Sequence, residues 1–228
     1  MLPKLDERLS LAASFAKEGA AVADIGCDHG KLAVNLAASG RFPKVIGADL
    51  REGPLAKAAL TLKNAACQDL VELRLGDGLS VLRQGEVGTI IIAGVSAQTT
   101  IDILAAAPWT WGVCAPRLVL VPATKHSVLR TWLAQQGFAL LRDCPVQAAG
   151  RWYTVICAEY SGIKTPPEQL SLADKVYGKT ACEANFAPYA ALQRGKLQKE
   201  RRSIPEGTTL AQEMDALFAA AEKNERKK

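Results

Sequence analysis

Short apolar runs and amphipathic stretches alternate along most of this chain. Runs rich in Val, Ile or Leu predict five buried strands, at residues 21–25, 44–48, 71–75, 89–93 and 117–121. Stretches with helical periodicity lie before, between and after these runs, at residues 5–17, 30–39, 53–66, 97–107 and 125–136. Strands that alternate with helices in this way form a parallel sheet with both faces covered.

Two more strands follow the last of these helices without a helix between them. Gly137 ends the helical stretch, and Phe138–Arg142 and Trp152–Glu159 read as strands on either side of the turn-like residues 147–150. Such a pair is antiparallel and belongs at one edge of the sheet. The pattern therefore predicts an α/β fold with a Rossmann-like, seven-stranded sheet in which the last strand is reversed.

The composition changes at residues 161–167, where Gly, Thr and Pro predict a stiff loop between a domain at 1–160 and a tail at 168–228. One helix is expected over roughly 188–203, and Thr208 or Thr209 can cap a second helix. The second helix has an apolar face made of Leu210, Met214, Leu217, Phe218 and Ala221. We expect these two helices to form an antiparallel hairpin.

Composition excludes some classes of protein. The 228 residues hold no run near the roughly 20 apolar residues of a membrane span and no apolar signal core at the start. Six scattered cysteines without a Cys-x-x-Cys pair, and only two histidines, predict no metal site. Reduced cysteines are typical of a cytoplasmic protein. The formal net charge of +5 permits a nucleic-acid partner without requiring one.

Three carboxylates follow successive predicted strands. Asp24, Asp49 and Asp77 each stand where an apolar run ends. Ligands of open α/β sheets bind at this edge. An acid about 20 residues beyond a glycine turn accepts hydrogen bonds from ribose hydroxyls, and an acid one strand further can reach an adenine amino group. The three acids predict a pocket for an adenosine-containing cofactor.

The glycine turn after the first strand indicates which cofactor this is. A dinucleotide-binding turn reads Gly-x-Gly-x-x-Gly, whereas the corresponding positions here are Gly26, Asp28 and Lys31. A carboxylate at Asp28 would repel a pyrophosphate, but it suits the sulfonium and ammonium of S-adenosylmethionine (SAM). The pattern favours SAM over NAD or ATP. Two alternatives remain at this point, that Asp28 only caps the following helix and that His29 is a local hydrogen-bonding group.

The first helix of the tail carries a run of basic residues, which are Arg194, Lys196, Lys199, Arg201 and Arg202. A solvated charged face is the common explanation of such a run. A footprint for RNA phosphates is the alternative, because the helix lies outside the predicted cofactor domain.

These motifs resemble those of the bacterial tRNA (adenine-N1) methyltransferases that modify position 22 of tRNA. The matching segments are Leu5…Arg8-Leu9…Ala13, Ala23-Asp24-Ile25-Gly26-Cys27-Asp28-His29, Glu52-Gly53-Pro54, Arg74-Leu75-Gly76-Asp77-Gly78-Leu79, Ile92-Ala93-Gly94, Leu129-Arg130-x-Trp132-Leu133 with Gly137-Phe138, Tyr153 to Glu159, and Phe186-x-Pro188.

The resemblance implies a class I methyltransferase sheet that binds SAM and a helical, coiled-coil-like tail that helps to hold tRNA. It implies cofactor contacts from the following residues: Asp24, Gly26, Cys27, Asp28, His29, Gly30, Asp49, Leu50, Asp77, Gly78, Ala93 and Gly94. The candidate substrate contacts are Arg8, Ser96, Pro122, Arg194, Lys196, Lys199, Arg201 and Arg202. The expected acceptor is N1 of an unpaired or flipped adenine in tRNA.

Two segments depart from the family pattern where the methyl acceptor should enter. The family has Ala-Gly-Met-Gly-Gly after the fourth strand, and here Val95-Ser96-Ala97 follows Ala93-Gly94. After the fifth strand it has Gln-Pro-Asn, and here the sequence is Val121-Pro122-Ala123. The added bulk is expected to crowd the path of the acceptor. The chain could therefore be a weak or inactive SAM- or RNA-binding homologue, or a methyltransferase with another acceptor.

Methyl transfer from a sulfonium is an in-line displacement, so the enzyme mainly aligns its reactants. Adenine N1 has an available lone pair, and no general base is assigned. The chain lacks an Asp/Asn-Pro-Pro-Tyr/Phe motif after the fourth strand, which argues against methylation of an exocyclic amino nitrogen. The sequence leaves the oligomeric state open.

Overall fold

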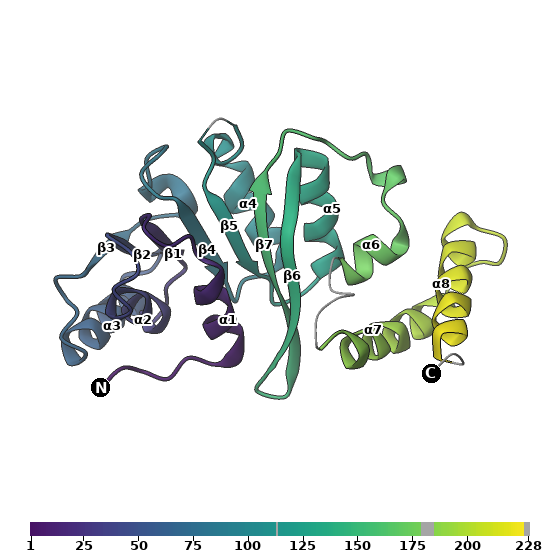
Figure 1. Ribbon diagram of the computed structural model, residues 1–228, viewed down its shortest axis with the longest axis horizontal. Coiled ribbons are helices and arrows are strands. Elements are labelled where there is room, and N and C mark those ends of the chain that lie inside the picture. The colour runs from purple at the N-terminus through teal and green to yellow at the C-terminus, as the bar shows by residue number, and fades with distance from the viewer. Residues whose placement is uncertain (113, 179–184, 226–228) are drawn as a thin grey trace.

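The computed structural model of the chain describes residues 1–112, 114–178 and 185–225. Its centre is a seven-stranded sheet in the order β3-β2-β1-β4-β5-β7-β6 (Figure 1). The strands are β1 (Val22–Ile25), β2 (Val45–Asp49), β3 (Val71–Leu75), β4 (Thr89–Ala93), β5 (Arg117–Val121), β6 (Phe138–Ala148) and β7 (Arg151–Tyr160). The first five strands are parallel, and β7 pairs antiparallel with both β5 and β6. This arrangement confirms the predicted fold class.

Helices cover both faces of the sheet. They are α1 (Glu7–Phe15), α2 (Lys31–Ala38), α3 (Glu52–Asn64), α4 (Ala97–Ala105) and α5 (His126–Gln136), with short 3-10 helices η1 (Gly78–Val81), η2 (Pro108–Thr110) and η3 (Pro167–Gln169). One buried cluster joins α1, α2 and α3 to one face of the sheet, and a second joins α4 and α5 to the other. Burial on both faces explains why the central strands read as continuous apolar runs.

The edge strand β6 is longer than its sequence indicates. The predicted strand stopped at Arg142, whereas β6 continues to Ala148 through a register shift between Leu140 and Arg142. Asp143 and Pro145 hide the strand in the sequence, because both residue types are uncommon in sheets. Pro145 is tolerated because β6 lies at the sheet edge.

The tail forms α6 (Leu172–Tyr177), α7 (Phe186–Arg201) and α8 (Thr209–Glu225) at the end of the molecule opposite the N-terminus (Figure 1). The sequence indicated α7 and α8 but not the short α6. Thr208 is the residue whose hydroxyl oxygen accepts a hydrogen bond from the first turn of α8, at 3.2 Å from the nitrogen of Ala211. Met214 is buried, as expected for a core residue.

A buried ion pair joins the tail to the sheet domain. The Arg130 guanidinium of α5 contacts the Asp143 carboxylate of β6 at 2.7 Å, and both side chains are almost fully buried. Arg130 Nη1 also donates a hydrogen bond to the carbonyl of Val176 in α6, at 2.8 Å. Gly178 follows α6 with φ of +60°, and a Cβ there would collide with the Asp143 carboxylate. The pair therefore fixes α6 against α5 and β6.

Candidate functional site

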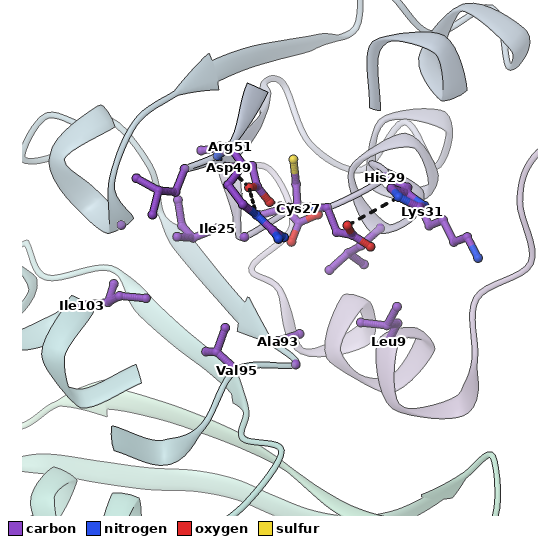
Figure 2. Close-up of a pocket in the computed structure, with 18 of the residues that line it drawn as sticks. Leu9, Ile25, Cys27, His29, Lys31, Asp49, Arg51, Ala93, Val95 and Ile103 are labelled. Carbon is purple, nitrogen blue, oxygen red and sulfur yellow. Dashed lines mark hydrogen bonds and ion pairs between the residues drawn. The ribbon is translucent and has the colours of Figure 1, made fainter. Parts of the chain in front are cut away.

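A cavity of about 770 Å³ opens at the carboxyl ends of the parallel strands. It lies beside β1 and β4, the neighbours at which the strand order reverses, and this is where open α/β sheets bind ligands. Figure 2 shows Asp49, Cys27 and His29 along one side and Ile103 and Val95 along the other. Twelve candidate residues line the cavity: Arg8, Asp24, Gly26, Cys27, Asp28, His29, Asp49, Leu50, Asp77, Gly78, Ala93 and Gly94.

The turn between β1 and α2 has a backbone that glycine allows. Gly26 and Gly30 have φ of +73° and +70°, and Asp28 between them also has a positive φ of 49°. Gly30 does not line the cavity. A Cβ at Gly30 would lie 3.0 Å from the Cβ of Ala58 on α3, so this glycine allows α2 and α3 to pack closely.

Asp28 does not cap α2, because no side chain makes a cap hydrogen bond at that helix. Its carboxylate is 64% exposed and stands 3.6 Å from Nε2 of His29. Its backbone N–H instead donates to Oδ2 of Asp49, at 3.1 Å. The Asp28 carboxylate is therefore available to a ligand at the cavity wall.

Asp49 is oriented by the backbone on either side of it. One carboxylate oxygen accepts from the Asp28 amide and the other from the Arg51 amide, at 3.1 and 3.0 Å. The next residue, Leu50, is 63% exposed although it is apolar, and it lines the cavity. A fixed acid beside an exposed apolar side chain suits a sugar hydroxyl next to an aromatic base.

Asp24 is the most deeply buried acid of the cavity, with 3% of its surface exposed. Among the described residues its Oδ2 has no hydrogen-bond partner. Burial raises the pKa of Asp24 to about 7; the backbone amide of Ala33 lowers it, and the charges of Asp49 and Asp28 raise it further. A buried carboxyl in this state would be stabilised as an anion by a cation placed in the cavity.

The loop after β3 brings Asp77 and Gly78 to the cavity. Arg74 holds this loop, because its Nη1 donates to the carbonyl of Val81 at 2.6 Å while its Nη2 pairs with Glu86, also at 2.6 Å. A Cβ at Gly78 would lie 3.2 Å from Ile103 of α4. Gly78 therefore lets the loop approach α4 closely.

The acceptor side differs from the expectation. Ser96 does not line the cavity, because it caps α4 with Oγ 3.1 Å from the Thr99 nitrogen. Ala97 is fully buried in the core, so its side chain does not crowd an acceptor. Pro122 is also buried and away from the cavity wall. Val95 and Thr99 from this segment do line the cavity.

The basic residues of the tail lie away from the cavity wall. Arg201 contacts Asp215 at 2.9 Å and Glu206 at 2.8 Å, so it joins α7 to α8 rather than presenting a free charge. Lys199 and Arg202 are exposed. Lys196 lies near His126 at the start of α5; burial lowers the pKa of that histidine to about 4, helped by the charges of Arg130 and Lys196.

Some lining residues were not anticipated from the sequence. They are Lys4, Asp6, Leu9, Ile25, Lys31, Leu32, Ala48, Arg51, Gly76, Thr99 and Ile103. Most neighbour an expected residue, but Lys4 and Ile103 come from the N-terminal segment and from α4, and only the tertiary structure brings them here. In the part of the chain that the structure describes, no group of His, Cys, Asp and Glu could hold a metal ion, and no helix is long and apolar enough to cross a membrane.

Comparisons with known proteins agree with this geometry. A family model described as "Methyltransferase domain" matches residues 5–156. The tRNA (adenine(22)-N(1))-methyltransferase of Bacillus subtilis (strain 168) is 30% identical over 156 residues, which cover 68% of this chain and 65% of that protein.

Solved structures extend the likeness into the tail. The crystal structure of Sp1610 from Streptococcus pneumoniae, proposed to be a tRNA (m1A22) methyltransferase, has a TM-score of 0.80 and 25% identity over 95% of this chain and 99% of that one. The complex of the same protein with S-adenosyl-L-methionine has a TM-score of 0.77 over the same shares of the two chains.

Proposed function

Because this chain belongs to the methyltransferase domain family, we propose that it transfers a methyl group from SAM to N1 of an unpaired adenine in tRNA. The observation that carries the proposal is the unpartnered carboxylate oxygen of Asp24 in an acidic cavity at the strand ends. A ligand with a sulfonium and an ammonium would supply the missing charge, whereas a pyrophosphate would add to the repulsion. The relatives named for SAM and for position 22 of tRNA support the same reading.

We propose that different residues of the cavity bind different parts of SAM. Asp49 would accept hydrogen bonds from the ribose hydroxyls, and Asp77 would accept one from the adenine amino group. Leu50 and Ile103 would contact the faces of the adenine. Asp24 and Asp28 would face the cationic methionine end. We propose the same division of the chain as before, with a cofactor domain at 1–160 and a helical tail at 168–228.

SAM supplies a methyl group on a positively charged sulfur. The protein has to exclude water, hold the acceptor nitrogen in line with that methyl group, and stabilise the positive charge of the sulfonium. Adenine N1 has its own lone pair, so no side chain has to remove a proton. The base must leave its helix or come from a loop, because N1 lies on the edge used in pairing.

We propose tRNA as the partner and the cytoplasm as the location. The exposed Lys199 and Arg202 on the tail are suited to RNA phosphates, and the charge of the whole chain favours an anionic partner. A second candidate is a methyltransferase with another acceptor, or a weakly active homologue. It is favoured by the acceptor side of the cavity, where Val95 stands in place of the methionine of the family pattern.

The deciding experiment supplies labelled SAM and total bacterial tRNA and identifies the methylated nucleoside by mass spectrometry. We expect N1-methyladenosine at position 22. A different methylated nucleoside would show that the acceptor is not adenine N1 and would identify the actual acceptor. If SAM binds and no RNA is methylated, the binding homologue is the better reading.

A further inference from the structure

Arg8 is held in one orientation at the wall of the cavity. It lies in the first turn of α1, and its side chain is 22% exposed. Its Nε donates to Oδ2 of Asp6 at 3.0 Å, while Oδ1 of Asp6 accepts from the amide of Leu9 at 3.0 Å. The guanidinium carbon stands 5.2 Å from the centre of the Tyr153 ring on β7. A helix cap and an aromatic ring thus fix this arginine.

The outer part of the guanidinium is left for another partner. Among the described residues, no hydrogen bond is made by Nη1 or Nη2 of Arg8. Nη1 lies 3.7 Å from the position that a Cβ on Gly94 would take, so this end of the side chain reaches the carboxyl end of β4. Lys4 also lines the cavity, and so do the acids Asp24, Asp28 and Asp49.

We propose that Arg8 is the receptor of this cavity for an oxyanion, either a carboxylate or a phosphate. The two terminal nitrogens of a guanidinium form a planar fork that matches two oxygens of such a group. Asp6 occupies Nε alone and leaves this fork available. A cavity lined both by acids and by a fixed arginine would orient a ligand that carries charges of both signs.

The proposal rests on the proposed function for the two anions that could reach Arg8. One is the methionine carboxylate of SAM, and the other is the phosphate of the nucleotide whose base is methylated. Both are oxyanions that can accept two hydrogen bonds from a guanidinium, but one belongs to the cofactor and the other to the RNA. Hydrogen bonds to charged groups of this kind change an affinity by roughly 10- to 100-fold when they are removed.

The test uses the full chain with Arg8→Gln, which keeps a polar side chain and removes the charged fork. Calorimetry measures the binding of SAM and of decarboxylated SAM, which lacks only the carboxylate. Filter binding measures the affinity of tRNA for the protein saturated with S-adenosylhomocysteine. Arg41→Gln is the matched control, because Arg41 also pairs with an acid (Glu18, 3.1 Å) and also stacks on a ring (Phe42, 5.0 Å) but does not line the cavity.

If the anion is the cofactor carboxylate, Arg8→Gln weakens SAM binding roughly 10- to 100-fold and leaves decarboxylated SAM unchanged. If it is the phosphate, both cofactors bind as in the wild type, and tRNA binds more weakly with a salt slope lower by about 0.7–0.9. Arg8→Lys keeps the charge without the fork and should give a smaller loss of the same kind.

Equal losses for SAM and decarboxylated SAM would assign Arg8 a purely structural role and overturn the proposal. So would three affinities that match those of the wild type. Failure of the proposed function gives a different result. In that case the wild-type protein binds SAM but methylates no RNA, and the binding of SAM and of decarboxylated SAM to Arg8→Gln can still be compared.

Discussion

Replacing Asp24 by Asn should stabilise the protein while it weakens cofactor binding. The pKa of the carboxyl rises from 3.8 to about 7 on folding, chiefly because it is buried. At 1.36 kcal/mol per pH unit, this rise corresponds to at most ~4 kcal/mol. The folded protein binds the proton more tightly than the unfolded chain, so stability is lost as the pH rises from about 4 to about 7. Asn cannot ionise and is not subject to this loss.

The assay is urea unfolding of wild type and Asp24→Asn, without ligand, between about pH 5 and pH 8. The free energy of unfolding of the variant relative to the wild type should increase with pH and level off above about 7. We expect a gain of roughly 1–3 kcal/mol at pH 8, less than the limit because the Asn amide must also be accommodated. Asp69→Asn is the control, because Asp69 is exposed in the loop before β3.

SAM binding should change in the opposite direction. Asp24 has to ionise to face a cation, so the wild-type affinity should fall by up to about tenfold per pH unit below pH 7, with release of a proton on binding. The variant should bind more weakly at pH 8 and lose this pH dependence. A stability difference that does not vary with pH, or a variant that binds SAM with the wild-type pH profile, would refute the role given to Asp24.

Three further predictions concern other parts of the molecule. Asp49→Ala should weaken SAM binding by roughly 1.5–3 kcal/mol in calorimetry, because a charged acceptor of hydrogen bonds is lost; equal affinities would contradict this. Arg130→Met should lower the free energy of unfolding in urea by roughly 3–5 kcal/mol, since it leaves Asp143 buried without its partner; a loss below about 1 kcal/mol would show that the pair is unimportant. The double change Lys199→Gln and Arg202→Gln should reduce the slope of log affinity for tRNA against log salt by roughly 1.4–1.8, and an unchanged slope would exclude these two residues from the RNA surface.

The sheet could be predicted from the sequence because its signals are local. Strands buried on both faces give apolar runs, and the helices between them give a different period, so the first five strands lie within a residue of their expected bounds. The second half of β6 could not be found in this way. Its Asp143 pairs with Arg130, a residue 13 positions away on α5. This tertiary contact outweighs the low preference of aspartate for strands.

The cofactor side of the cavity could also be anticipated, because strand ends meet at one edge of a parallel sheet. Asp24, Asp49 and Asp77 needed no further information. Lys4 and Ile103 did, since nothing in the sequence indicates that the N-terminal segment and α4 reach the same cavity. In the tail, the basic run suggested one surface, but Arg201 is satisfied by acids of the α7–α8 connection and of α8 itself.

The acceptor side shows why sequence alone misjudges which residues add bulk. Replacing Met-Gly-Gly of the family pattern by Val95-Ser96-Ala97 suggests that the side chains at 96 and 97 narrow the path. In the structure the start of α4 turns them in different directions: the Ala97 side chain enters the core and the Ser96 hydroxyl caps the helix. Only Val95 remains at the cavity, joined there by Thr99 from the first turn of α4. Glycine at 96 or 97 would therefore remove a cap or a core contact without opening the path, because Val95 and Thr99 are the residues of segment 95–99 that line the cavity.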